Sequence, residues 1–351
     1  MSKYDKRYFI VLALLGLLFI SSCANEYSDF HLENAAYEKN ISDIVDNKEK
    51  FKLTNILYSD VKIATLPDNT TLDRIIDNIK SAKKRVYLEV YILTEKRIIK
   101  ELTDAKRRGL DVSVILEKNV LGSPSINSKA FKILQNVGIK VRYANNNNYI
   151  FTHSKFFIFD DSYILGTGNM SHSTFYDNME FYLFGKDKKN ISILESVFSD
   201  DMNGIRSIHC DANVITSPFC SRFAFEKTLN QAKSSIYIYA QQIKDPSLEK
   251  ILKSKAEQGI KISMILADPK KVSSNQNIID DFKKTDNVSI YIPKKSYVHA
   301  KVFIIDNETI YIGSINFTSN SMDNNREVGF IFNDKENADN LIRQFNNHIG
   351  Q

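Results

Sequence analysis

The chain has 351 residues, a length typical of two domains of ordinary size. Apolar residues make up 43% and charged residues 25%, which is the balance of a globular protein with large cores. A disordered, collagen-like or disulfide-framework protein is therefore excluded. The formal net charge of +5 suits an anionic substrate but does not indicate a protein that coats DNA.

Residues 1–22 are predicted to be a lipoprotein signal peptide. Lys3, Lys6 and Arg7 form a positive N-terminal region, and residues 9–20 are apolar apart from one glycine. A bilayer span needs about 20 apolar residues, so this run is too short to cross a membrane. Its length is that of a signal-peptide core.

The next residues, Ile20-Ser21-Ser22-Cys23, resemble the bacterial lipobox, in which the cysteine is diacylated and becomes the mature N-terminus. The alternative is an ordinary secretory signal with Cys23 as a bystander, but the small residues before the cysteine favour the lipobox. Several acyl chains anchor a protein stably. We therefore expect an exported, membrane-anchored bacterial lipoprotein, periplasmic or on the cell surface, with residues 23–50 as a polar tether.

Two cysteines remain, Cys210 and Cys220, in the stretch that joins the two halves of the chain. In an oxidising compartment they could form a disulfide, and the alternative is a pair of buried free thiols. A zinc site built from these cysteines and His209 lacks a fourth ligand, so no metal site is expected.

The remainder of the chain is organised as an internal repeat. Residues 76–116 align with residues 226–266 at a constant offset of 150. The first copy begins with a helix whose apolar residues are three and four apart, followed by a strand at 86–92, a second helix and a strand at 112–116. The second copy has strands at 236–243 and 260–266. Both second helices end before a glycine at matched positions, Gly109 and Gly259.

Strands that alternate with helices predict an α/β fold with two similar α/β/α sandwich halves related by a pseudo-two-fold. We place the first half at residues 51–205 and the second at residues 206–351. We expect a monomer with this internal pseudo-dimer, and no obligate protein partner is implied.

A chemical motif follows in each copy. His153, Lys155 and Asp160 form an H-x-K-x4-D pattern, and the same pattern recurs in the second copy. Each copy continues with a G-x-x-N segment and a glutamate, which lies 27 residues after the histidine in the first copy and 28 in the second. The second-copy motif is His299, Lys301 and Asp306; the later residues are Thr167, Asn169 and Glu180 in the first copy and Ser314, Asn316 and Glu327 in the second.

These residue types fit phosphodiester chemistry. Histidine and lysine at positions i and i+2 of a strand point to one face, so a two-fold would gather two histidines and two lysines in one cationic pocket. One histidine can attack phosphorus while the other protonates the leaving oxygen. The lysines and the asparagine amides can stabilise the charge on the phosphoryl oxygens. Neither a metal nor another cofactor is expected.

The chain resembles the phospholipase D superfamily, whose paired motifs read H-x-K-x4-D-x6-G-S-x-N. The resemblance covers about residues 65–345. The second copy fits in full, whereas the first has five residues between Asp160 and Gly166 and has Thr167 in place of the serine. Threonine keeps a hydroxyl, so we expect activity to be retained.

The resemblance implies a phospholipase D-like fold and a role for each motif residue. His153 would be the nucleophile that forms a phosphohistidine, and His299 the general acid. Glu180 and Glu327 would hydrogen-bond the histidines and hold their tautomers. The motif aspartates Asp160 and Asp306 are expected to be structural, and the hydroxyls of Thr167 and Ser314 are expected at the substrate phosphate.

The resemblance fixes the reaction centre rather than the substrate. The expected lipid anchor favours phospholipids at a membrane surface, so we predict a metal-independent phosphodiesterase that hydrolyses or transfers phosphatidyl groups. The alternatives are an exported endonuclease of the same fold, acting on DNA or RNA, and a catalytically idle lipoprotein that binds anionic ligands. Basic pairs such as Lys294-Lys295 suit either anionic polymer or anionic head groups.

Overall fold

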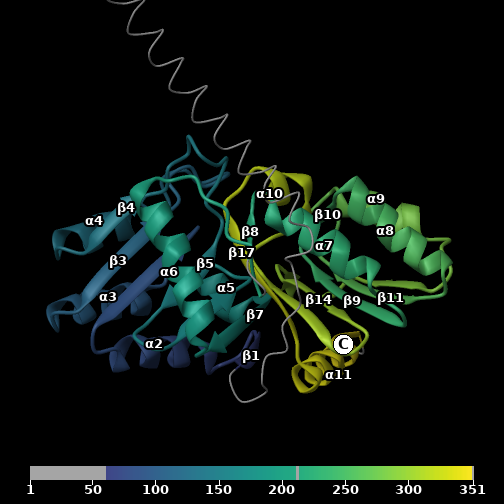
Figure 1. The fold of residues 1–351 in the computed structure, drawn as a ribbon, viewed down its shortest axis with the longest axis horizontal. Coiled ribbons are helices and arrows are strands. Elements are labelled where there is room, and N and C mark those ends of the chain that lie inside the picture. The colour runs from purple at the N-terminus through teal and green to yellow at the C-terminus, as the bar shows by residue number, and fades with distance from the viewer. Residues whose placement is uncertain (1–60, 211–212, 350–351) are drawn as a thin grey trace, which may run out of the picture. The chain divides into compact units, whose positions relative to one another are not determined.

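The computed structural model describes residues 61–210 and 213–349 (Figure 1). The expected signal peptide, Cys23, the tether at residues 23–50 and the start of the first half lie outside the described residues. The described residues belong to one compact unit that contains both halves of the repeat. No helix within the described residues is both long enough and apolar enough to span a bilayer.

The first half is built on a mixed sheet of strand order β1-β7-β6-β5-β2-β3-β4. Strands β2, β3 and β4 run parallel, whereas β5, β6, β7 and β1 are joined by antiparallel pairs. Its elements are β1 (Val61–Leu66), α2 (Thr71–Ser81), β2 (Arg85–Val90), α3 (Lys96–Arg107), β3 (Asp111–Leu116), α4 (Ser128–Asn136), β4 (Lys140–Tyr143), β5 (Lys155–Ile158), β6 (Tyr163–Gly166), α5 (His172–Tyr176), β7 (Asn178–Gly185) and α6 (Lys188–Asn203).

The second half repeats this arrangement. Its sheet has the order β8-β17-β15-β14-β9-β11-β12, so each strand occupies the place of its counterpart in the first sheet. Its elements are β8 (Val214–Ser217), α7 (Cys220–Asn230), β9 (Ser235–Ala240), β10 (Ile243–Lys244), α8 (Pro246–Glu257), β11 (Lys261–Leu266), α9 (Asn275–Phe282), β12 (Val288–Tyr291), β13 (Tyr297–Val298), β14 (Lys301–Ile305), β15 (Thr309–Gly313), β16 (Phe317–Thr318), α10 (Ser319–Asp323), β17 (Glu327–Asn333) and α11 (Lys335–Ile349). The expected α/β fold with two similar halves is confirmed.

Apolar side chains pack against both faces of the first sheet. On one face, residues such as Leu88 and Val114 pack with Ile75 of α2 and Ile98 of α3. The opposite face belongs to a second core, which is shared by both halves and includes helices α6 and α11. Across it the rings of Tyr163 and Phe330 lie 5.3 Å apart. The halves are therefore joined by a continuous apolar core, whose burial drives their association.

The helix ends follow the signals in the sequence. Helix α3 ends at Arg107 and α8 at Glu257, each two residues before a glycine. Gly109 and Gly259 have φ values of +89° and +86°, in the left-handed region that favours glycine. The matched glycines therefore terminate matched helices and turn the chain into β3 and β11.

The motif aspartates fix the turns that lead into β2 and β9. The Asp160 carboxylate accepts hydrogen bonds from the backbone N–H groups of Lys83, Lys84 and Arg85 at 2.6–3.3 Å. Asp306 does the same for residues 233–235, at 2.7–3.0 Å. Each aspartate follows the C-terminal end of the strand that begins with the motif lysine. The aspartates and the histidines therefore lie at opposite ends of β5 and β14.

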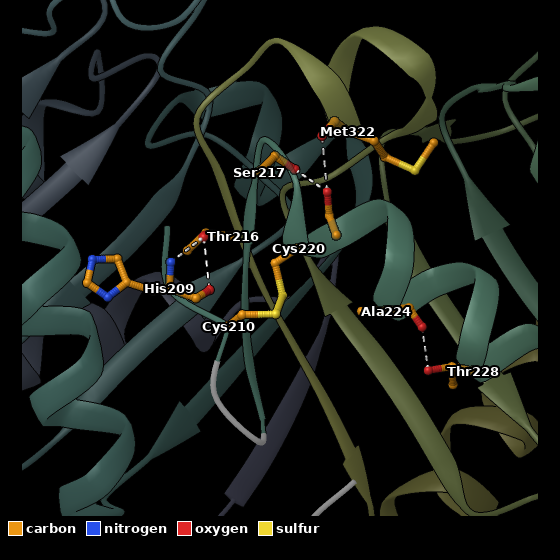
Figure 2. The surroundings of a disulfide bond; sticks show 9 residues. His209, Cys210, Thr216, Ser217, Cys220, Ala224, Thr228 and Met322 are labelled. Atoms are coloured by element: carbon orange, nitrogen blue, oxygen red, sulfur yellow. Dashed lines mark hydrogen bonds between the residues drawn. A yellow bond between two sulfur atoms is a disulfide. The ribbon is translucent and has the colours of Figure 1, made fainter. Parts of the chain in front are cut away.

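A disulfide joins Cys210 to Cys220 (Figure 2). It connects the segment before β8 to the first residue of α7, in line with the disulfide alternative. Beside it, the Thr216 hydroxyl donates to the His209 carbonyl oxygen at 2.9 Å and accepts the His209 N–H at 3.1 Å. The His209 ring bonds to Asp200 at 2.9 Å.

Replacing both cysteines, as Cys210→Ser with Cys220→Ala, should lower the free energy of unfolding by about 2–3 kcal/mol, because a closed loop of ten residues limits the entropy of the unfolded chain. Urea unfolding followed by circular dichroism measures the loss. Dithiothreitol should produce the same loss in the wild type and none in the variant. Equal stability of the two proteins under oxidising conditions would contradict a stabilising role.

Candidate active site

Each motif histidine lies where its strand enters the shared core. His153 precedes β5, and its backbone N–H donates to the Arg326 carbonyl oxygen of the second half at 2.7 Å. His299 precedes β14, and its N–H donates to the Met179 carbonyl oxygen of the first half at 3.2 Å. The backbone around each histidine is therefore fixed by the opposite half.

The histidine side chains are also held across the two halves. His153 Nδ1 lies 2.8 Å from Glu327 Oε2, and His299 Nδ1 lies 2.7 Å from Glu180 Oε1. Both glutamate side chains are 0% exposed, and the histidine side chains are 13% and 12% exposed. The resemblance identified these four residues, but it did not indicate that each histidine would pair with the glutamate of the other copy.

These pairs fix the histidine tautomers. Burial by itself raises the pKa of Glu180 and Glu327, but the facing histidines and the nearby lysines outweigh it and lower the pKa of both carboxyls. The carboxylates are therefore ionised and can only accept. Each Nδ1 must carry the proton, which leaves Nε2 as the free nitrogen of each ring.

Both histidines are neutral at pH 7. Burial lowers the pKa of His153 to about 4, although the Glu327 carboxylate acts in the opposite direction. Burial also lowers the pKa of His299, again against the pull of Glu180. A neutral imidazole with an unprotonated Nε2 is the form that can act as a nucleophile.

The motif lysines lie beneath the histidines, with no exposed surface. Each Nζ donates to the carbonyl oxygen of its own histidine, and Lys301 Nζ also donates to Gln241 Oε1 at 3.0 Å. Burial lowers the pKa of Lys301 to about 8 and lowers that of Lys155 as well. A bound anion would therefore stabilise the charged form of both lysines.

The two histidines open into one cavity of about 860 Å³. Asn169 and Asn316, from the G-x-x-N segments, also line it. Their side-chain Oδ1 atoms are buried without a hydrogen-bond partner in the described part of the chain. An unpaired buried amide is costly, so these two side chains are suited to a polar ligand in the cavity.

The hydroxyls of Thr167 and Ser314 do not occupy the expected position at the substrate phosphate. Both residues are fully buried and neither lines the cavity. The Thr167 hydroxyl donates to Glu180 Oε2 at 2.6 Å, and Ser314 Oγ accepts the Val328 N–H at 3.0 Å. We therefore correct this expectation, because the two hydroxyls face the glutamate strands behind the histidines.

Sequence reasoning missed several residues of the site. Asn178 donates to Glu180 at 3.4 Å and Asn325 donates to Glu327 at 3.2 Å. An N-x-E pattern precedes both glutamates, so the repeat itself carried this signal. Tyr91, whose ring stands edge-on to His153 with centroids 4.7 Å apart, has no such signal because its counterpart is Gln241.

A buried charged network next to His153 spans the two halves of the chain. Arg326 is fully buried, and its Nε donates to Asp201 Oδ1 at 3.0 Å. Close by, the Ser154 hydroxyl donates to the buried Glu89. Burial and then the charge of Asp201 raise the pKa of Glu89 well above its usual range. This network links Asp201 of α6 to Arg326, the residue immediately before β17.

The symmetry-related positions next to His299 lack this network. Tyr239 stands in the place of Glu89, His348 in that of Asp201 and Met179 in that of Arg326. The Tyr239 hydroxyl lies 3.0 Å from His348 Nδ1. Each histidine therefore pairs with a glutamate in the same way, but the residues packed behind the two pairs differ.

The comparisons with known proteins agree with this site. The family model described as "Cardiolipin synthase, PLD-like domain" matches the chain twice, at residues 75–202 and 225–349. The chain belongs to the phospholipase D superfamily. A cardiolipin synthase of Staphylococcus aureus is 30% identical over 129 residues, which cover 35% of this chain and 25% of that protein. A polyphosphate kinase of Vibrio vulnificus is 24% identical over 264 residues, covering 69% of this chain and 37% of the relative.

Among solved structures, phosphatidylserine synthase of Haemophilus influenzae superposes with a TM-score of 0.70 at 13% identity, covering 89% of this chain and 90% of that chain. Polyphosphate kinase of Porphyromonas gingivalis superposes with a TM-score of 0.64 at 14% identity, covering 81% and 49% respectively. The phospholipase D fold of the chain is thereby established. The chain spans a quarter to about a third of the length of the curated relatives it matches.

Glu327→Gln should change the side-chain nitrogen resonances of His153, because the amide cannot hold the Nδ1–H tautomer as a carboxylate does. The His299 resonances should stay as in the wild type, and Glu180→Gln should have the mirror effect. Long-range ¹H–¹⁵N NMR spectra of the histidine rings measure both. A Glu327→Gln protein in which only His299 responds would contradict the crossed pairs.

Proposed function

We propose that the protein is a metal-independent phosphodiesterase of phospholipase D type, which hydrolyses or transfers phosphatidyl groups through a phosphohistidine intermediate. The observation that supports this most directly is the pair of neutral histidines held by buried carboxylates and opening into one cavity. Two asparagines line the cavity beside the histidines, and two buried lysines lie beneath them, which suits stabilisation of charge at phosphorus.

In the first step, the lone pair of His153 Nε2 attacks phosphorus. A nitrogen–phosphorus bond forms while the bond to the leaving alcohol oxygen breaks. His299 takes up a proton on Nε2 from solvent when the anionic substrate binds, and it donates this proton to the leaving oxygen. The assignment of His153 as nucleophile follows the resemblance of the first motif, since the crossed pairs hold both rings in the same way.

In the second step, His299 takes a proton from water or from a second alcohol, whose oxygen attacks phosphorus. The nitrogen–phosphorus bond breaks and His153 is restored. Water gives hydrolysis, whereas an alcohol gives transfer. During both steps the lysine ammonium groups and the amides of Asn169 and Asn316 stabilise the charged phosphoryl oxygens.

Phospholipids are the substrates that several observations favour. Cardiolipin synthase and phosphatidylserine synthase, among the relatives, are named for phospholipid products. The polyphosphate kinases share the fold under a different name, so the fold alone does not choose the substrate. The proposed lipid anchor at Cys23 would bring the cavity to a membrane surface.

His153→Ala and His299→Ala should each lower turnover by about 10³-fold or more, because the two histidines carry out different steps. The assay follows head-group release from mixed phospholipid vesicles in EDTA. An Ile133→Ala protein, changed on the surface helix α4, is the matched control. Near-wild-type turnover in either histidine variant, or loss of wild-type activity in EDTA, would overturn the mechanism.

The same assay, repeated with DNA and RNA, distinguishes a phospholipid substrate from a nucleic-acid substrate. Release that disappears in both histidine variants supports the phospholipase. If no lipid is cleaved but DNA or RNA is, and the cleavage needs both histidines, the protein is the nuclease instead. If vesicles, DNA and RNA all stay intact, the idle anion-binding protein is favoured.

We expect kcat/KM for the soluble diester bis(p-nitrophenyl) phosphate to fall as the pH rises through about 8. Lys301 has a pKa of about 8 in the free protein, so it is charged below that pH and loses its charge above it. The substrate remains a monoanion throughout, so it does not contribute to the profile. Initial rates between pH 5 and 10 measure the effect. A profile that is flat from pH 7 to 10 would exclude Lys301 as a charged participant.

A further inference from the structure

The active-site cavity has an apolar rim in the first half, formed by Leu121 and Ile150. Leu121 is 80% exposed and Ile150 is 51% exposed. Leu121 and Phe151 line the cavity. The two loops that carry the rim are joined by a hydrogen bond from Asn119 Nδ2 to Asn146 Oδ1 at 3.4 Å. Leu121 therefore lies at the cavity itself, and Ile150 directly precedes the cavity-lining Phe151 on the neighbouring loop.

The second half contributes a lysine rim, formed by four exposed side chains: Lys270, Lys271, Lys294 and Lys295. The Lys271 ammonium group lies 5.1 Å from the centre of the Tyr297 ring, two residues before His299. The Tyr297 hydroxyl accepts a hydrogen bond from Gln241, which lines the cavity, at 3.0 Å. Lys271 is therefore connected through Tyr297 to the cavity wall, and the other three lysines are its neighbours or the near neighbours of Tyr297 along the chain.

The internal repeat gives these two rims equivalent places in the fold. Counted from β3 and β11, Leu121 corresponds to Lys271. Counted back from the two histidines, Tyr149 and Ile150 correspond to Lys295 and Ser296. The pseudo-two-fold thus preserves the catalytic residues while the rim is aliphatic on one side and cationic on the other.

The cavity wall divides in the same way. The first half contributes mainly apolar and aromatic side chains: Tyr91, Ile92, Val120, Leu121 and Phe151. The second half contributes mainly polar ones: Gln241, Gln242, Lys244, Glu249, Ser319 and Asn320. A ligand with one apolar and one polar side would therefore have a matching wall for each.

We propose that the two rims form one docking surface for a membrane of anionic phospholipids. This inference rests on the phospholipase activity proposed above and names the substrate class. Leu121 and Ile150 insert between the lipids, while the lysine rim contacts their phosphates and anionic head groups. The glycerol and acyl side of the substrate then faces the first half, and its head group faces the second.

Single-stranded nucleic acid fits this surface less well. Lysines would attract its phosphates, but its bases stack on exposed aromatic rings. The exposed large apolar side chains of this rim are a leucine and an isoleucine, which have no flat face for stacking. An aliphatic rim beside a cationic one is the pattern of a protein that binds a lipid surface.

The chain has no tryptophan, so one introduced tryptophan reports on its own site. We would place it as Leu121→Trp in the full chain with His153→Ala, which prevents turnover. The matched control is Ile133→Trp in the same background, because Ile133 is 36% exposed on α4 and does not line the cavity. The N-terminal segment is identical in both proteins, so only the local site differs.

With vesicles of phosphatidylcholine and phosphatidylglycerol in equal parts, emission of Leu121→Trp should shift to the blue and be quenched by brominated lipids. Ile133→Trp should not respond, and vesicles of phosphatidylcholine alone should give a weaker shift. No shift at position 121, an equal shift at both positions, or a response to single-stranded DNA but not to vesicles would overturn the proposal.

A second experiment removes the lysine rim by changing its four lysines to glutamine. The ratio of turnover on anionic vesicles to turnover on bis(p-nitrophenyl) phosphate should fall about tenfold or more. The charge-matched control changes Lys83, Lys84, Lys283 and Lys284, which are exposed and outside the cavity lining. Equal ratios in the two variants would overturn the proposed role of the lysine rim in binding anionic lipids.

These readouts separate the inference from the proposed function. If the wild type does not hydrolyse bis(p-nitrophenyl) phosphate or any lipid, the proposed function fails, whatever the tryptophan reports. If it hydrolyses the soluble diester and position 121 does not respond to anionic vesicles, the docking surface fails alone.

Discussion

Each motif histidine is paired with a carboxylate from the opposite half of the chain. The distances of 2.8 Å and 2.7 Å between the rings and Glu327 and Glu180 exist only when the two halves are packed together. The shared apolar core supplies the free energy for that packing. Folding and assembly of the site are therefore one event, because neither half alone contains a histidine with its carboxylate partner.

The crossed pairs also govern the charge of the cavity. When both lysines are protonated and both histidines are neutral, the charges of the two buried lysines and the two buried glutamates cancel. A phosphodiester monoanion adds one negative charge, and a proton on one histidine restores the balance. Substrate binding is thus linked to proton uptake, which supplies the proton that the leaving oxygen needs. The low histidine pKa of the free protein and the need for a general acid are compatible for this reason.

Much of the fold and of the site could be predicted from the sequence. The repeat at an offset of 150 predicted both sheets, and the paired motifs identified the histidines, lysines and glutamates. The crossing of the pairs could not be predicted, because it depends on how two similar halves meet rather than on spacing along either one. Thr167 was misplaced for a related reason: its hydroxyl could face the phosphate or the glutamate behind the histidine, and the motif does not distinguish them.

Other residues of the site carried a signal only where the repeat preserved it. Asn178 and Asn325 recur before both glutamates and could have been found. Tyr91 and Gln241 occupy equivalent positions with different chemistry, so the alignment of the two copies conceals them. The repeat thus reveals what both halves share, whereas the features that distinguish the two walls become visible only in three dimensions.

The buried network of Arg326 and Asp201 has a consequence for how the halves can combine. Two copies of the first half would bring Met179 to the place of Arg326 and leave the Asp201 carboxylate buried without a cation. Two copies of the second half would bury Arg326 against His348 and Tyr239, with no carboxylate to accept from it. Both arrangements bury an uncompensated charge, which costs several kcal/mol. The two halves therefore form a pseudo-heterodimer within one polypeptide. They share one fold, but the buried charges favour pairing of the first half with the second over pairing of either half with a copy of itself.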